Sequence, residues 1–185
     1  GTRKGKPALI TEFGGSPMGD TLGTLKKQFH LSLWKGFFGE HAFAPMFWWF
    51  EIVEEQNLYT EYAAFAAVTE GVDRREMKRS GHRTADGQAL LDILNSNDTI
   101  LVWGWDQSYY YSRDENNRGP LIDDISIKIG GLVPDNYTIE IWDCYNDTPL
   151  EKRRLKVHRT DQKFNVQIPP FRRNFALKVT PSKDR

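Results

Sequence analysis

The feature that most constrains the fold is a pair of short, nearly uninterrupted apolar runs, each followed by a segment with helical periodicity. The runs span residues 8–13 and 45–50. A short run that is apolar on both faces is typical of a strand buried in a parallel sheet. The segments that follow repeat apolar residues every three or four positions, as an amphipathic helix does. The order strand, helix, strand, helix predicts the βαβα unit of a parallel sheet or barrel.

The two helices have readable ends. The first is expected to begin at a cap on Asp20 or Thr21 and to run to about Phe37, and the second is expected over residues 58–72. His30 lies next to the apolar stripe of the first helix, where a lone histidine is more often structural than catalytic. That stripe consists of Leu22, Leu25, Phe29, Leu33 and Phe37.

From residue 89 onward the pattern changes to short alternating runs separated by turn residues. Such runs at this spacing predict an antiparallel β-sandwich, which we expect to fold independently of the first part. We therefore expect three parts: a βαβα domain over 1–73, a linker over 74–88 and a sandwich over 89–185. Strands are expected over 100–105, 125–129, 137–143, 153–157, 164–168 and 175–179.

Residues 73–87 are rich in Arg, Lys and His and almost free of apolar side chains. A basic run of this kind is usually a solvated connector. The whole chain has 25 basic and 25 acidic residues, so nothing indicates a nucleic-acid patch.

One carboxylate has an unusual position. Glu12 ends the first apolar run, directly before Gly14 and Gly15, and alternation places it on the same strand face as Ile10. Burying an unpaired charge is costly, so a glutamate at this point needs a partner or a chemical role. A glutamate at a strand end can equally lie in solvent or cap the next helix. The residues alone leave both interpretations open.

The segment Pro-Ala-Leu-Ile-Thr-Glu-Phe-Gly-Gly at 7–15 resembles the seventh strand of the clan A glycoside hydrolases. This is the (β/α)8-barrel group that includes the family 5 cellulases and mannanases. In that group the glutamate of this strand end is the catalytic nucleophile. The resemblance therefore implies that role for Glu12.

The next segment extends the resemblance. Residues 34–73, with Pro-Met-Phe-Trp-Trp at 45–49, are similar to the eighth βα unit of bacterial cellulase-like members. The eighth strand of the group ends in an aromatic residue that stacks on the sugar, which implies a substrate-binding role for Trp48 or Trp49, with Glu51 beside them. Core packing is the alternative for these tryptophans. Neighbouring residues of a strand point to opposite faces, so the two cannot both serve one surface.

The later half also resembles the C-terminal sandwich that follows some clan A barrels, through Gly-Leu-Val-Pro-Asp-Asn-Tyr at 131–137 and Pro-Pro-Phe-Arg-Arg-Asn-Phe-Ala-Leu-Lys-Val at 169–179. The expected fold class is therefore α+β: a partial (β/α)8-barrel remnant followed by an antiparallel β-sandwich.

The chain departs from the group in one decisive respect. A retaining glycosidase needs two carboxylates about 5 Å apart. In this group the second is a glutamate that follows an asparagine at the end of the fourth strand, and no buried strand of this sequence ends in Asn-Glu. Only two of the eight barrel strands have a counterpart. We expect either the C-terminal portion of a larger enzyme or a degenerate relative.

The first functional hypothesis is the C-terminal portion of a retaining hydrolase of β-linked polysaccharide, inactive as an isolated chain. Its mechanism needs no metal or organic cofactor. The resemblance implies a carbohydrate partner and a periplasmic or secreted location. The exposed barrel remnant is expected to favour self-association.

The second hypothesis is a non-catalytic carbohydrate-binding or structural module. Its binding face would be Trp103, Trp105 and residues 109–111.

No apolar run reaches the ~18 residues of a membrane span. The single cysteine, Cys144, excludes an internal disulfide. The Asp- and Asn-rich loop at 106–120 lacks the spacing of a calcium-binding EF-hand, which favours a solvated loop.

Overall fold

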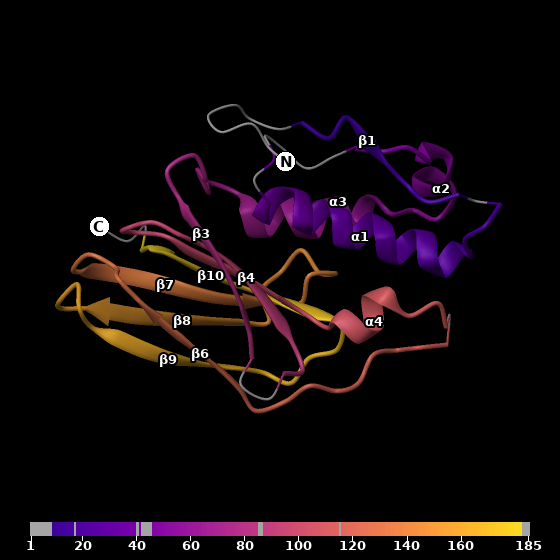
Figure 1. The fold of residues 1–185 in the computed structure, drawn as a ribbon. Coiled ribbons are helices and arrows are strands. Elements are labelled where there is room, and N and C mark those ends of the chain that lie inside the picture. The colour runs from indigo at the N-terminus through magenta and orange to yellow at the C-terminus, as the bar shows by residue number, and fades with distance from the viewer. Residues whose placement is uncertain are drawn as a thin grey trace.

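The computed structural model describes residues 9–16, 18–39, 41, 46–84, 87–114 and 116–182. It is a mixed α+β structure with several sheets. Figure 1 shows its layers: a small pair of strands, then helices, then a large sheet, with a second small sheet beyond it. Within the described residues, no helix is long and apolar enough to cross a membrane.

The N-terminal part contains the expected parallel strands in shortened form. Strand β1 (Glu12–Phe13) pairs in parallel with β2 (Met46–Phe47), so that Glu12 lies opposite Met46 and Phe13 opposite Phe47. Residues 8 and 45, where the strands were expected to begin, lie outside the described residues. The second strand ends early because helix α2 (Phe50–Glu55), which the apolar run concealed, begins at its last expected residue.

Helix α1 (Leu22–Phe38) is buried on two sides. Its first turn is capped by Thr21, whose Oγ1 accepts a hydrogen bond from the Thr24 backbone N–H at 3.2 Å. Phe29 packs against Phe47 of β2, with ring centroids 5.3 Å apart, whereas Trp34 packs on the large sheet. Helix α3 (Tyr59–Thr69) lies beside α1 in the same layer (Figure 1). The expected single stripe therefore describes only part of the buried surface of α1.

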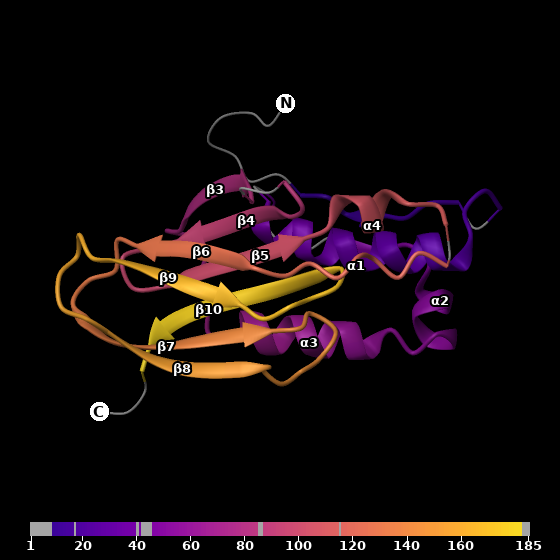
Figure 2. The same ribbon diagram turned by 90° about the horizontal axis from the view of Figure 1, so that it is seen from below.

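The large sheet has six strands in the order β3-β4-β5-β10-β7-β8, and all neighbours are antiparallel. A second sheet pairs β6 and β9, also antiparallel. Figure 2 shows β6 and β9 on one face of the large sheet and α1 and α3 on the other. The strands are β3 (Lys78–Arg83), β4 (Leu90–Asn95), β5 (Ile100–Trp105), β6 (Ile125–Gly130), β7 (Asp135–Trp142), β8 (Glu151–Val157), β9 (Lys163–Ile168) and β10 (Asn174–Pro181).

The expected connector over 74–88 is wrong in one respect, because it contains β3. This strand pairs with β4 along its whole length, from Lys78 opposite Asn95 to Arg83 opposite Leu90. It is an edge strand, and an edge strand needs only one backbone partner and tolerates charged side chains. Its sequence therefore lacks the apolar alternation that identifies the other strands.

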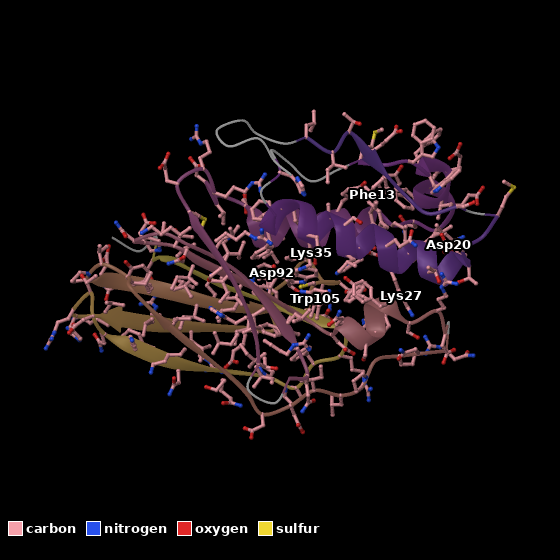
Figure 3. All side chains as sticks on the ribbon, viewed as in Figure 1. Phe13, Asp20, Lys27, Lys35, Asp92 and Trp105 are labelled. Carbon is pink, nitrogen blue, oxygen red and sulfur yellow. The ribbon has the colours of Figure 1, made fainter. Side chains whose placement is uncertain are left out.

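The helices and the large sheet share one hydrophobic cluster. The indole ring of Trp34 stacks on that of Trp103 with centroids 5.8 Å apart. At the rim of this contact, Lys35 Nζ donates to Asp92 Oδ2 at 2.5 Å, and the same oxygen accepts from the Trp105 indole at 3.0 Å (Figure 3). The first and second halves of the sequence thus bury their largest aromatic residues against each other.

Candidate functional site

Glu12 is the first residue of the two-residue strand β1, and its side chain lies on the open face of the β1–β2 pair. Phe13, the next residue, points the other way and lies between the pair and α1, in contact with Phe47 at a centroid distance of 5.3 Å (Figure 3). Alternation therefore directs Glu12 away from the helices. In the described part of the chain, no hydrogen bond or ion pair engages its carboxylate. The carboxylate is thus free to meet a ligand.

Trp49 fixes the loop that follows Glu12. Its indole N–H donates to the Gly15 carbonyl at 2.6 Å. The ring lies so close to Gly14 that a Cβ at that position would come within 3.0 Å of Trp49 Cδ1. Gly14 is therefore required for a close contact between a backbone and an aromatic ring. This contact joins the exits of β1 and β2.

Trp48 and Glu51 are more accessible. Trp48 is 51% exposed, and its backbone N–H continues the pairing of the two strands by donating to the Phe13 carbonyl at 2.8 Å. On the open face, Met46 opposite Glu12 is 58% exposed. Glu51 is exposed in the first turn of α2. All four residues singled out from the sequence are thus carried by the strand pair or by the turn that leaves it.

The binding face of the second hypothesis is wrong for most of its residues. Trp103 and Trp105 are buried under α1, and Tyr109 and Tyr110 belong to the same cluster. Only Tyr111 is exposed, at 62%. The alternating pattern of an isolated strand cannot show that a helical layer covers its outer face.

A buried polar network escaped the sequence interpretation. His30 is fully buried, and its Nε2 accepts from the Asn174 amide at 2.5 Å. The ring proton therefore lies on Nδ1, which donates to Glu61 Oε2 at 2.7 Å. Asn174 also donates to the Tyr110 hydroxyl at 2.5 Å, which lies 3.2 Å from that of Tyr145.

Burial dominates the acid–base behaviour of this network. It raises the pKa of the Tyr110 and Tyr145 phenols well above the usual value for tyrosine, so both remain neutral. His30 was correctly interpreted as structural. Glu61 and Asn174 are 113 residues apart in sequence and carry no motif, so only the fold could have identified their association.

The residues singled out from the sequence offer the carboxylates of Glu12 and Glu51, which no described residue engages, and the accessible indole of Trp48. Of these, Glu12 is carried by the strand pair itself, where a carboxylate could act as a nucleophile or stabilise positive charge. Among the described residues, no group of three or more His, Cys, Asp or Glu side chains could hold a metal ion.

Comparisons with known proteins place the fold among glycoside hydrolases. No family model and no curated protein matches the chain. A family 30 endoxylanase from Clostridium papyrosolvens superimposes with a TM-score of 0.55 at 11% identity, covering 96% of this chain and 42% of its own. A family 30 subfamily 8 xylanase from Clostridium acetobutylicum gives 0.52 at 12% identity, covering 97% and 43%. A family 39 enzyme from Xanthomonas axonopodis pv. citri gives a TM-score of 0.46 at 12% identity, covering 95% of this chain and 45% of its own.

At these identities the similarity shows the fold alone. The chain spans less than half the length of the family 30 neighbours. The expected likeness to glycoside hydrolases is confirmed at this level. The finer assignment to family 5 is not confirmed, since at 11–12% identity the family 30 neighbours show a shared fold only.

Proposed function

We propose that this chain is the part of a retaining glycoside hydrolase, acting on β-linked polysaccharide, that supplies the catalytic nucleophile Glu12. The observation that carries the proposal is an exposed, unengaged carboxylate in a short strand that pairs in parallel with its neighbour, one residue before that strand ends. Catalytic residues of (β/α)8 barrels lie at the carboxyl ends of the strands. The glycoside hydrolase fold of the structural neighbours supports the same interpretation.

In this proposal β1, α1, β2 and α3 correspond to the last two βα units of a barrel, and strands β4 to β10 form the β-sandwich that follows, with β3 from the predicted linker added at one edge of its large sheet. Apart from β3, the division of the chain into 1–73, a linker over 74–88 and 89–185 stays a prediction. Both family 30 neighbours are described as xylanases, so β-xylan is the first substrate to test, followed by β-glucan and β-mannan.

Each strand-end residue has a distinct proposed role. Trp48 offers its exposed ring as the platform on which a sugar stacks. Trp49, tied to Gly15, holds the loop after Glu12 in place and is not itself the platform. Glu51 accepts hydrogen bonds from sugar hydroxyls at the edge of the site.

The chemistry follows from one carboxylate. Glu12 attacks the anomeric carbon, the glycosidic bond to the leaving oxygen breaks, and a covalent glycosyl-enzyme forms that water later hydrolyses. Protonation of the leaving oxygen requires a second carboxyl group about 5 Å from the first, supplied by another part of the barrel. General acid help of this kind accelerates reactions by about 10²–10⁴-fold. The isolated chain is therefore expected to be inactive.

The open face of the strand pair needs to be covered, either by other barrel strands or by a second copy of this chain. Met46, Trp48 and Phe50 expose apolar surface there, and Phe50 is 70% exposed. In the complete enzyme, further barrel strands cover this face; in the isolated chain, a second copy covers it instead. Light scattering that gives a monomer at high protein concentration would contradict self-association. Because polymeric substrates lie outside the cytoplasm, we place the enzyme in the periplasm or the medium.

The proposal is tested in the full-length gene product. Glu12→Gly should lower turnover of an aryl β-xyloside by several orders of magnitude. Added azide should then restore activity, because the small anion occupies the space of the carboxylate and attacks the same carbon. The product should be the glycosyl azide of inverted configuration, as direct displacement requires.

Glu55→Gln is the matched control, because this exposed glutamate lies at the end of α2, away from the strand ends. Its turnover should equal that of the unmodified enzyme. The proposal fails if Glu12→Gly retains full turnover, or if azide restores nothing while the variant keeps its fold.

A further inference from the structure

A cavity of about 530 Å³ lies on the side of the helical layer that faces away from the strand pair. It opens between the first turns of α1 and α3, helix α4 (Gln107–Tyr111), and the loops before β10 and after α4. Figure 3 shows Lys27 on the side of α1 that faces α4. Since Phe29 packs toward β2, α1 separates this cavity from Glu12. The two sites are therefore distinct.

The lining of the cavity is strongly cationic. It contains five basic side chains and a single carboxylate, that of Glu61, although the whole chain has equal numbers of basic and acidic residues. Glu61 is already engaged, because its Oε2 accepts a hydrogen bond from His30 Nδ1 at 2.7 Å. The positive ends of the α1 and α3 dipoles add to the same potential. The five cationic residues are Lys26, Lys27, Arg118, Arg172 and Arg173.

These cations lack carboxylate partners. Of the described residues, none places a carboxylate oxygen within 4.0 Å of any of the five. Lys27 is only 7% exposed, and its ammonium group instead donates to the Ser112 and Asp114 carbonyls at 3.1 and 3.2 Å. Arg172 donates to the Gly119 carbonyl at 2.6 Å. The Asp143 carboxylate acts on Arg173 from outside the lining, but five clustered cations still repel one another, and a bound anion would relieve that cost.

The guanidinium group of Arg173 is held in place. It lies 3.9 Å from the centroid of the Tyr145 ring, which itself stacks on His30 at 4.1 Å. The Arg173 backbone has φ of 69°, a left-handed conformation that is uncommon for arginine. Strained backbone of this kind persists where the surrounding structure fixes it, and it concentrates at ligand sites. Glu61 and Tyr145 of the buried polar network therefore line the base of the cationic cavity.

We propose that this cavity binds a small molecule through a phosphate or carboxylate group. Planar guanidinium groups match the paired oxygens of both anions, and charge-assisted hydrogen bonds to them are among the strongest in proteins. The volume lies in the range of small-molecule pockets and is too small for a folded partner. The helix N-termini at its mouth favour the same ligands.

The test is isothermal titration calorimetry on the 185-residue chain at low, matched ionic strength. Inorganic phosphate and citrate are the two probes, titrated separately. Saturable binding that weakens as sodium chloride is added is expected for at least one probe. Tighter binding of phosphate assigns a phosphorylated ligand, and tighter binding of citrate assigns a carboxylated one.

Two variants locate the binding. Arg118→Gln removes an exposed cation of the lining and should weaken binding by about tenfold or more. Arg173→Lys keeps the charge but loses the planar fork, and a comparable loss is expected. Arg159→Gln is the matched control, because Arg159 is exposed and pairs with Asp161 outside the cavity; its affinity should be unchanged. Circular dichroism checks that each variant is folded.

Two results would overturn the proposal. One is the absence of saturable binding for both probes. The other is unchanged affinity in folded Arg118→Gln and Arg173→Lys. Neither result bears on Glu12, because the calorimetry involves no glycoside.

Discussion

The two sides of the helical layer differ sharply. On the side of the large sheet, α1 buries Trp34 and Phe38 completely against Trp103. On the other side, among the described residues, it packs against the short strand pair and against Val53, Leu58 and Tyr62, while Met46 of β2 and the following Trp48 stay exposed. The interface between α1 and the large sheet is a fully buried hydrophobic core. The strand pair on the other side covers α1 but leaves its own outer apolar face exposed.

The contrast distinguishes aromatic residues that hold the layers together from those that remain exposed. Aromatic residues that look alike in the sequence serve the two sides differently: Trp34 and Trp103 hold layers together, and Trp48 lies open to a ligand. Exposed apolar side chains that gather into a patch can mark an interaction surface, whereas single ones are ordinary. The catalytic proposal therefore concerns the β1–β2 strand pair. Most of the stability should come from the interface between α1 and the large sheet.

Removal of the helical layer should have the largest effect. A chain shortened to residues 74–185 keeps all strands of both antiparallel sheets but exposes Leu101, Trp103 and Trp105. We expect this fragment to bind a hydrophobic dye and to associate as its concentration rises, in place of the independent folding that the sequence favoured. Dye fluorescence and light scattering, compared with the full chain, measure both effects. A monomeric fragment with a cooperative thermal transition would show that the shared cluster is dispensable.

A matched pair of tryptophan substitutions sharpens the comparison. Trp34→Ala removes a fully buried ring and should lower the free energy of unfolding by about 3–5 kcal/mol. Trp48→Ala removes a ring that is half exposed and should cost less than about 1 kcal/mol. Urea denaturation of the two variants against the unmodified chain gives both values. Equal losses would mean that the strand pair contributes as much to stability as the sheet interface.

The sequence predicted most of the strands that bury alternating residues. The expected strand over 100–105 coincides with β5, and those at 125–129, 164–168 and 175–179 fall within β6, β9 and β10. Strands β6 and β9 alternate buried and exposed residues, whereas β5 and β10 are buried along most of their length and appear in the sequence as largely apolar runs. The antiparallel pairing that this pattern predicts is confirmed.

The missed features depend on contacts between distant residues. Strand β3 is a charged edge strand, and α2 begins within an apolar run, so neither has the periodicity of its class. The cationic cavity joins Lys26 and Lys27 to Arg172 and Arg173, which are far apart in the sequence. Zero net charge concealed the cluster, because net charge carries no information about where charges gather. The identity of Glu12 as the residue to test came from a strand-end motif, and its catalytic role stays a proposal.

The smallest expected effect lies where the chain passes from the helical layer to the large sheet. Arg74 is anchored there, because it donates to the Phe37 and Gly39 carbonyls at the end of α1, whereas its neighbour Arg75 is exposed and pairs with Asp73. The hydrogen bonds from Arg75 lower the pKa of the Asp73 carboxyl from 3.8 to about 2. A lowered carboxyl pKa contributes stability that is fully present above pH 3.8 and is lost as the pH falls toward 2. Because the pair is exposed, the contribution should be near the detection limit.

NMR titration of the Asp73 carboxyl measures the interaction directly, without relying on that small difference in stability. Its midpoint should lie near 2 in the unmodified chain and return toward 3.8 in Arg75→Gln. Arg74→Gln is the matched control: it should leave the midpoint unchanged, because Arg74 directs its guanidinium to α1. A midpoint that shifts in Arg74→Gln but not in Arg75→Gln would contradict this, because it would make Arg74 and not Arg75 the partner of Asp73.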